Sequence, residues 1–173
     1  FKIGVVDEIV NIGGVLTGDV NWVNTKAYKI NALTRVENGT LTIQPGTFVL
    51  GGPRVDDPTA LIITTSAKIN AQGTRSRPII MTSAQPFGSR SREDWGGLVM
   101  LGKARLNVAG GTAFIEGLDN RPYLQYGGND DTHDCGALAY VRVEYGGSVF
   151  TVNNEVNSFT WGACGKGTKA EYL

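Results

Sequence analysis

The sequence predicts an all-β protein, specifically a right-handed parallel β-helix with an N-terminal cap and one long loop excursion. Three observations predict this fold class. Helical periodicity is almost absent, and short apolar runs bounded by Gly, Pro, Asn, Asp or Ser recur instead. The corners after these runs do not resemble β-hairpin turns. Glycine accounts for 24 of 173 residues, which suits tight bends between short strands.

The predicted strands follow one another along most of the chain. Leu41–Leu50 and Leu61–Asn70 share a layout of strand, small polar corner and strand, and Pro78–Thr82 then adds a third strand. Three short strands separated by corners describe one coil of a solenoid, whose stacked coils pair strand on strand about 4.8 Å apart. The runs expected to form strands are Tyr28–Leu33, Leu41–Ile43, Thr47–Leu50, Leu61–Thr64, Lys68–Asn70, Pro78–Met81, Gly97–Leu101, Leu138–Tyr145, Phe159–Trp161 and Glu171–Leu173.

The chain is expected to have three parts. Residues 1–11 form an N-terminal strand or arm, residues 12–40 form a cap, and residues 41–173 form the coils. The region at about 103–136 interrupts the succession of short strands and contains Gly-Gly pairs and an acidic run. We interpret it as a loop inserted into the coils. Long loops on a rigid scaffold are where function is commonly found.

Composition argues against several classes of function. Lys+Arg and Asp+Glu both number 16, so the chain lacks the basic excess that is typical of nucleic-acid binding. No apolar stretch approaches the roughly 18 residues of a membrane helix. One histidine, His133, and two cysteines are too few for a multi-histidine or four-cysteine zinc site. We expect no cofactor, with calcium as the one alternative.

Residues Phe87–Ala104, which read FGSRSREDWGGLVMLGKA, resemble the signature of a family of secreted β-helix proteins of Gram-negative bacteria. The resemblance extends over about residues 12–173. It implies a right-handed parallel β-helix outside the cell or on its outer surface, and it carries no agreed catalytic residues. The other segments that resemble coils of this family are Leu41–Thr47, then Tyr126–Asn129 with Gly136–Tyr145, then Asn153–Asn157 with Gly165–Thr168.

The two cysteines are placed to meet across neighbouring coils. Cys135 precedes the predicted strand Leu138–Tyr145, and Cys164 follows the predicted strand Phe159–Trp161. We predict a disulfide between them, which indicates an oxidising compartment and agrees with the secreted character of the family. The alternative is a pair of buried free thiols.

An oxygen-rich run in the inserted loop is a candidate metal site. Asp130, Asp131 and Asp134, together with Asn129, could supply oxygen ligands to calcium, although their spacing is not that of an EF-hand. A solvated acidic turn is the interpretation that we favour. His133 lies in the same run and is expected to be an exposed side chain rather than a catalytic base.

A second set of residues suggests carbohydrate binding. Aromatic rings stack on sugar faces, and glycoside hydrolysis uses two carboxyl groups about 5–10 Å apart. Trp95 with Asp94 and Glu144 are the candidate carbohydrate contacts, and Glu116 is a further carboxylate. Trp95 stands at the entry to a predicted strand, however, and this position favours a corner-packing role. The same structural role is expected of Trp22 and Trp161, with Trp161 inside the coil or covering its end.

These observations predict a non-catalytic extracellular or cell-surface structural protein that self-assembles or mediates adhesion. Open ends of a solenoid have unpaired backbone groups that seek partners, and an apolar strand can pair with such an edge. The alternative is a carbohydrate-binding or polysaccharide-cleaving β-helix domain. The partner expected first is a second copy of the chain, and extracellular glycans come next. The candidate assembly contacts are Phe1, Ile3, Val5, Val6, Tyr172 and Leu173.

Overall fold

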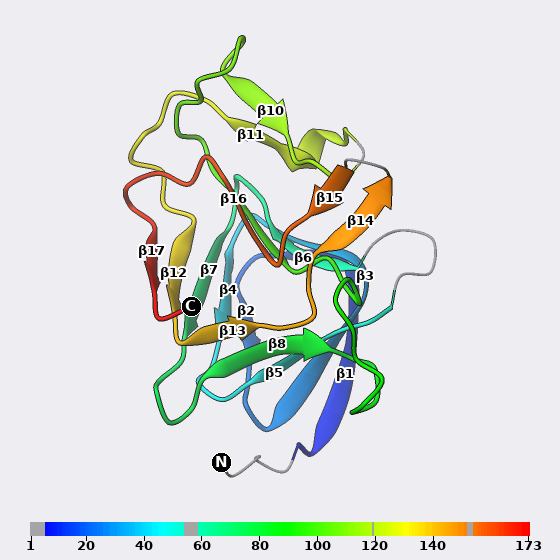
Figure 1. Cartoon of the computed structure of the whole chain (residues 1–173). Coiled ribbons are helices and arrows are strands. Elements are labelled where there is room, and N and C mark those ends of the chain that lie inside the picture. The colour runs from blue at the N-terminus through cyan, green and yellow to red at the C-terminus, as the bar shows by residue number, and fades with distance from the viewer. Residues whose placement is uncertain (1–5, 54–58, 119, 152–153) are drawn as a thin grey trace.

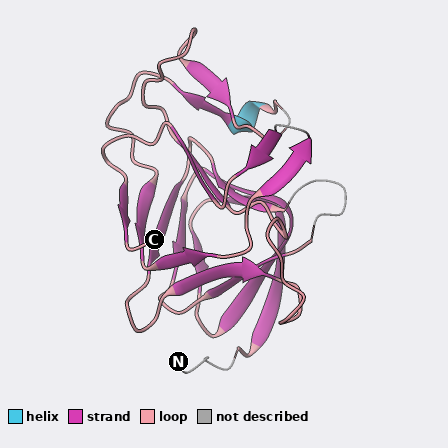
Figure 2. Ribbon diagram, viewed as in Figure 1, coloured by secondary structure: helices cyan, strands magenta, loops and turns pink. Residues whose placement is uncertain are grey.

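The computed structural model describes residues 6–53, 59–118, 120–151 and 154–173. Within these ranges the chain forms seventeen β-strands, one three-residue 3₁₀-helix and no α-helix (Figure 1). Figure 2 shows that strands dominate the whole fold and surround a central interior. The strands wind into a parallel β-helix, so the predicted all-β solenoid is confirmed. No helix in the described part of the chain is long and apolar enough to cross a membrane.

The solenoid has three faces, and neighbouring strands within each face run parallel. One strand from each face makes a coil, and the chain completes five coils. The first face comprises the N-terminal halves of β1 (Glu8–Thr17) and β3 (Lys26–Glu37), then β5 (Phe48–Gly51), β8 (Ile79–Ser83) and β13 (Val141–Val143). The second face comprises the C-terminal halves of β1 and β3, then β6 (Ala60–Ile63), β9 (Leu98–Leu101) and β16 (Phe159–Gly162). The third face comprises β2 (Val20–Trp22), β4 (Thr40–Ile43), β7 (Lys68–Gln72), β12 (Gly136–Ala139) and β17 (Lys169–Glu171).

Small polar residues turn the chain between faces, as the sequence predicts. At one corner the Thr47 amide donates to the carbonyl of Gln44 at 3.2 Å, and Gly46 between them has a φ of 86°. At the corner between the second and third faces the Ala67 amide donates to the carbonyl of Thr64 at 3.0 Å. These closed turns satisfy backbone groups that the strands leave unpaired.

Apolar side chains from all three faces fill the inside of the solenoid. Successive residues of a strand point to opposite sides, so every second residue faces inward. The buried inner cluster has aromatic residues near its N-terminal end, where the rings of Trp22 and Tyr28 stack with centroids 4.6 Å apart. It comprises Trp22, Tyr28, Ile30, Val36, Leu41, Ile43, Val49, Leu61, Ile63, Ala67, Ile69, Ala71, Ile79, Met81, Trp95, Leu98, Met100, Cys135, Leu138 and Val141.

The second face is buried on its outer side as well. All four residues of β6 and of β9 are buried, because two segments outside the coils cover them. One is the excursion, which contains β10 (Thr112–Phe114), the 3₁₀-helix η1 (Pro122–Leu124) and β11 (Gln125–Gly127) and lies at the top of Figure 1. The other is the hairpin of β14 (Ser148–Thr151) and β15 (Asn154–Val156). The buried residues of this outer cluster are Leu33, Ala60, Ile62, Val99, Leu101, Ile115, Leu124 and Val156.

Two boundaries differ from those expected from the sequence. The coils begin at β1, well before residue 41, and the region expected to be a cap forms strands of the first two coils. The predicted single strand over Leu138–Tyr145 is divided into β12 and β13. The division lies at Tyr140, whose φ of 47° ends one face and begins the next.

Candidate functional site

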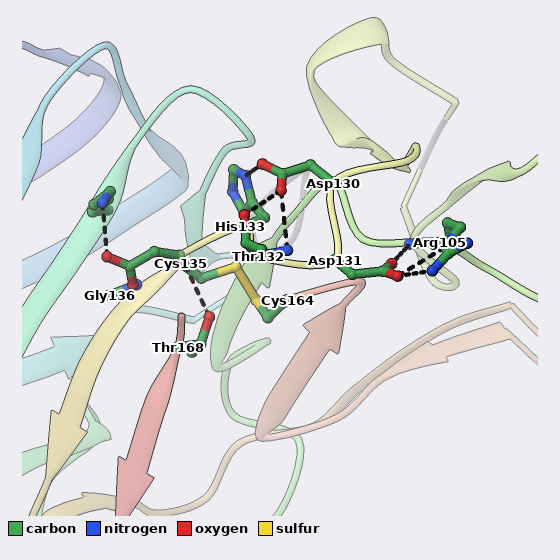
Figure 3. Close-up of polar contacts among 11 residues, drawn as sticks. Arg105, Asp130, Asp131, Thr132, His133, Cys135, Gly136, Cys164 and Thr168 are labelled. Carbon is green, nitrogen blue, oxygen red and sulfur yellow. Dashed lines mark hydrogen bonds and ion pairs between the residues drawn. A yellow bond between two sulfur atoms is a disulfide. The ribbon is translucent and has the colours of Figure 1, made fainter. Parts of the chain in front are cut away.

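The predicted disulfide joins the fourth and fifth coils. Cys135 lies just before β12 and Cys164 just after β16, with their Cα atoms 5.7 Å apart and their sulfur atoms bonded (Figure 3). Cys135 is fully buried, and its amide donates to the hydroxyl of Thr168 at 2.9 Å. The prediction of a disulfide is confirmed. The disulfide anchors the acidic run that precedes Cys135 to the fifth coil.

The acidic carboxylates do not converge on a common point. Asp131 forms an ion pair with Arg105, which lowers the pKa of Asp131 mainly through their side-chain hydrogen bond. Asp134 pairs with Lys68 at 2.7 Å, and this hydrogen bond is the main reason that the pKa of Asp134 is lowered.

Asp130 has a different partner from its acidic neighbours. Its Oδ1 accepts from the hydroxyl of Thr132 at 2.6 Å, which lowers the pKa of Asp130. Among the described residues there is no group of three His, Cys, Asp or Glu side chains that could hold a metal ion. Asp131 and Asp130 are therefore linked to Arg105 and Thr132 (Figure 3), and Asp134 is linked to Lys68.

His133 is largely buried, and the expectation of an exposed side chain is wrong. Its side chain is 12% exposed, and its Nδ1 lies 4.0 Å from the Oδ2 of Asp130. Its buried Nε2 has no hydrogen-bond partner among the described residues. Burial is the main reason that the pKa of His133 lies below its ordinary value. Backbone hydrogen bonds tie the residues before His133 to other segments: the Asp130 amide donates to the Lys103 carbonyl, and the Lys166 amide donates to the Asp131 carbonyl.

The candidate carbohydrate residues form a structural corner of the solenoid. Trp95 is 1% exposed, and its indole Nε1 donates to the carbonyl of Glu144 at 3.0 Å. Because the ring lies inside the core, it offers no face to a sugar. Asp94 accepts hydrogen bonds from the Ser83 hydroxyl at 2.5 Å and from the Ser91 amide at 3.0 Å. Trp95 therefore packs inside a corner of the solenoid, in the environment that its position in the sequence predicts.

The other candidate carboxylates, Glu144 and Glu116, lie in different surroundings from Asp94. The side chain of Glu144 forms an ion pair with Arg142 on the outside of the first face. Glu116 is exposed and lies on the excursion, just beyond β10. Asp94 itself holds the loop before Trp95 in place through its two hydrogen bonds. Asp94 and Glu144 therefore each have a local structural partner.

Both ends of the solenoid leave inward-facing apolar side chains partly exposed. In the fifth coil Phe159 and Trp161 point to the inner side of β16, and their ring centroids are 6.3 Å apart. Trp161 is 38% exposed, because it lies at the end of the coil stack as predicted. The partly buried apolar side chains packed on the core at the N-terminal end are Val10, Ile12, Leu16 and Val20.

The predicted assembly contacts are only partly within the described residues. Phe1, Ile3 and Val5 fall outside the described residues, and Val6 is half-buried. Tyr172 and Leu173 are 67% and 50% exposed, and the ring of Tyr172 stacks on Tyr140 with centroids 4.4 Å apart.

The outer side of the third face is polar and contains two neighbouring recesses. One, of about 590 Å³, is lined by Asn21, Thr42 and Gln44 among others. The other, of about 310 Å³, lies over Asn70 and Ala137. Both recesses are bordered by Thr40 and so lie side by side across the face. This surface was not predicted from the sequence, although the alternation of polar and apolar residues in Thr40–Ile43 is a signal of an exposed outer side.

Comparison with known proteins agrees with this architecture. Searches of the curated proteins and of the solved structures gave no match. The family model described as a pectate-lyase-like β-helix domain matches residues 14–173. This match covers the five coils apart from the start of β1, together with the excursion. The chain therefore belongs to the family of pectate-lyase-like β-helix domains.

Proposed function

We propose that this β-helix domain is an extracellular structural module that assembles with copies of itself through the two ends of its solenoid. The observation that carries the proposal is the exposure of inward-facing apolar side chains at both ends of the coil stack. Inside the solenoid the same positions are completely buried: Met100, the coil-four neighbour of Trp161, is 1% exposed, whereas Trp161 is 38% exposed. Covering such surface is favourable by about 25 cal/mol for each Å² removed from water.

Unpaired strand edges at the two ends also favour association. Among the described residues, β1 pairs with β3 along one side only, and at the opposite end β13, β16 and β17 each pair with a single strand. An edge strand presents a row of unpaired N–H and C=O groups and is a template for another chain. Apolar contact and strand pairing thus favour the same arrangement, with one solenoid end against another.

The disulfide supports a location outside the cell. Bonds of this kind form and persist in oxidising compartments and are uncommon in the cytosol. The Cys135–Cys164 bond is buried at its Cys135 end and ties an outer loop to the coils. A module that works outside the cell, as a structural or adhesive element, has a use for such a covalent support.

The test is the assembly state of the purified 173-residue chain. We expect concentration-dependent oligomers in analytical ultracentrifugation and elongated particles in electron microscopy. Trp161→Ser should weaken assembly, because it removes a half-exposed ring from the solenoid end. Phe87→Ser is the matched control, since Phe87 is 96% exposed on a corner loop and should leave assembly unchanged. A chain that stays monomeric at high concentration would overturn the proposal.

The polar third face favours glycan binding as a second candidate function. Its two adjoining recesses carry amide, hydroxyl and ammonium groups in register across neighbouring strands. Such groups bond the hydroxyls of an extended sugar chain. Binding of soluble polysaccharides, measured by calorimetry, should be lost when Ala137→Trp fills the smaller recess. Binding that is unchanged in this variant would place the glycan elsewhere.

A further inference from the structure

We infer that the assembly joint continues the solenoid in register, with the fifth coil of one copy stacked on the first coil of the next. This inference rests on the proposed function and adds to it the partner surface and the alignment. A head-to-tail contact of this kind uses two different surfaces and therefore does not close on itself. The five coils formed by residues 8–171 would span about 24 Å along the common axis.

Unbroken columns of paired residues define the register. Each column passes through all five coils, one residue per coil, and starts and finishes at an open end. Stacking in register brings the last residue of each column over the first residue of the same column in the next copy. The four inward-facing columns are Val10–Tyr28–Val49–Met81–Val143, Gly14–Thr34–Leu61–Leu98–Phe159, Leu16–Val36–Ile63–Met100–Trp161 and Trp22–Ile43–Ala71–Leu138–Ala170.

The side chains that meet in this arrangement are compatible in size. Phe159 comes over Gly14, which has no side chain and nothing within 4 Å of the place where a Cβ would stand. The ring therefore enters open space instead of clashing. Trp161 comes over Leu16 and continues a column whose other members are apolar. A large residue over a glycine is the arrangement by which packed layers interlock.

The rim strand β17 carries one charge of each sign, Lys169 and Glu171, and Asp19 lies just before the opposite rim strand β2. Lys169 in β17 is exposed and forms no ion pair with the described residues. Its column leads back through Ala137, Asn70 and Thr42 to Asn21. Stacking in register thus brings the Lys169 ammonium beside the segment that carries Asp19. Opposite charges at a rim favour correct orientation of the two copies.

The outer column of the first face provides a direct test. It begins at Ile9 and finishes at Arg142, so in-register stacking places these Cα atoms about 4.8 Å apart across the joint. That distance lies within the range of a disulfide. The double variant Ile9→Cys/Arg142→Cys should therefore form a ladder of covalent oligomers under mild oxidation on a non-reducing gel. Ile9→Cys/Lys169→Cys is the control, because these residues lie on different faces of the solenoid.

The outcomes separate the register from the proposed function. A ladder with Ile9→Cys/Arg142→Cys and none with the control supports the inferred joint. Oligomers of the parent chain that cross-link only in the control pair, or in neither pair, overturn the register while the self-assembly proposal stands. A parent chain that remains monomeric overturns both.

A second pair of variants tests the joint without cross-linking. Leu16→Asp places a charge on the inner side of β1, where the joint would bury it, and Val15→Asp places the same charge on the outer side of the same strand. We expect Leu16→Asp to reduce association at least tenfold and Val15→Asp to leave it unchanged. Circular dichroism and thermal melting establish that both variants fold. Equal association of the two folded variants would contradict the joint.

Discussion

Removal of the Cys135–Cys164 disulfide should lower the stability of the domain without dismantling its folded state. The bond closes a loop with a sequence separation of 29 residues. On the chain-entropy model, opening a loop of this length costs about 3.6 kcal/mol, because the unfolded chain regains conformations that the bond forbids. A domain of this size loses about 2–4 °C of melting temperature for each kcal/mol. The expected decrease is therefore about 7–14 °C.

The assay compares thermal unfolding of three samples by circular dichroism. These are the oxidised protein, the same protein reduced with a phosphine, and the Cys135→Ala/Cys164→Ala variant. The variant should melt slightly below the reduced protein, because alanine leaves a small cavity at the fully buried Cys135. At room temperature all three should retain the same β-sheet spectrum. The loop keeps other bonds to the coils, such as that from the Asp130 amide to the Lys103 carbonyl at 2.8 Å.

The result that would refute this reasoning is a reduced protein that melts within about 2 °C of the oxidised one. It would mean that the unfolded chain is already held compact in this region, so that the bond removes few conformations. Loss of the β-sheet spectrum on reduction at room temperature would also refute the reasoning, because the folded state is expected to survive without the bond. In that case the coils themselves would depend on the covalent link.

Three further predictions concern packing and charge. Gly51→Ala should destabilise the domain by about 1–3 kcal/mol in urea unfolding, because the added Cβ would overlap the buried ring of Trp95. Gly13→Ala is the control: its Cβ would meet Ala32 at an ordinary 3.6 Å, so the loss of stability should be less than half as large. Arg105→Ala should raise the pKa of Asp131 in a carboxylate NMR titration, because that pKa is lowered mainly by the hydrogen bond from Arg105. The ion pair stabilises the folded protein above the ordinary carboxyl pKa, and this stability is lost as the pH falls through the pKa of Asp131 in the folded protein. The parent protein should lose stability as the pH falls from about 6.5 towards the lowered pKa of the buried His133 imidazole, because the unfolded chain takes up the proton first. His133→Phe should remove this loss, and an unchanged pH profile in urea unfolding would contradict the prediction.

The sequence predicted the coil architecture because its inner residues and corners are local features. The run Leu61–Thr64 and the Gln44–Thr47 corner each form a single strand or a single turn, and both could be identified by inspection. The meeting of Cys135 and Cys164 followed from their positions beside strands of neighbouring coils. These inferences required knowledge of the order of strands but not of their exact register.

The first coil and the full length of β3 were missed because their signals are weak or merged. Glu8–Thr17 lies at the edge of the stack and is mostly exposed, so it lacks the apolar character of an inner strand. Lys26–Glu37 passes from one face to the next without a Gly or Pro corner, and the register alone shows that Ala27–Ile30 and Leu33–Val36 have different partners. A bend inside a continuous strand leaves little trace in composition.

The candidate sites were harder to predict, because function depends on contacts between distant residues. The spacing of Asp130, Asp131 and Asp134 suggested a shared ligand, but Arg105 and Lys68 draw two of the carboxylates to different places. Arg105 is 26 residues from Asp131, and Lys68 is 66 residues from Asp134. Contacts of such separation are fixed by the stacking of coils and cannot be obtained from local patterns.

The unequal cover of the three faces directs apolar association along the axis of the solenoid. The second face has the most apolar outer side, and its residues Ile62 and Val99 are already buried beneath the excursion and the β14–β15 hairpin. The third face is polar on its outer side. Apolar surface that remains exposed in register with the core is found at the coil ends, around Leu16 and Trp161. If the excursion were shortened so that the second face became exposed, we would expect lateral aggregation to compete with the end-to-end contact.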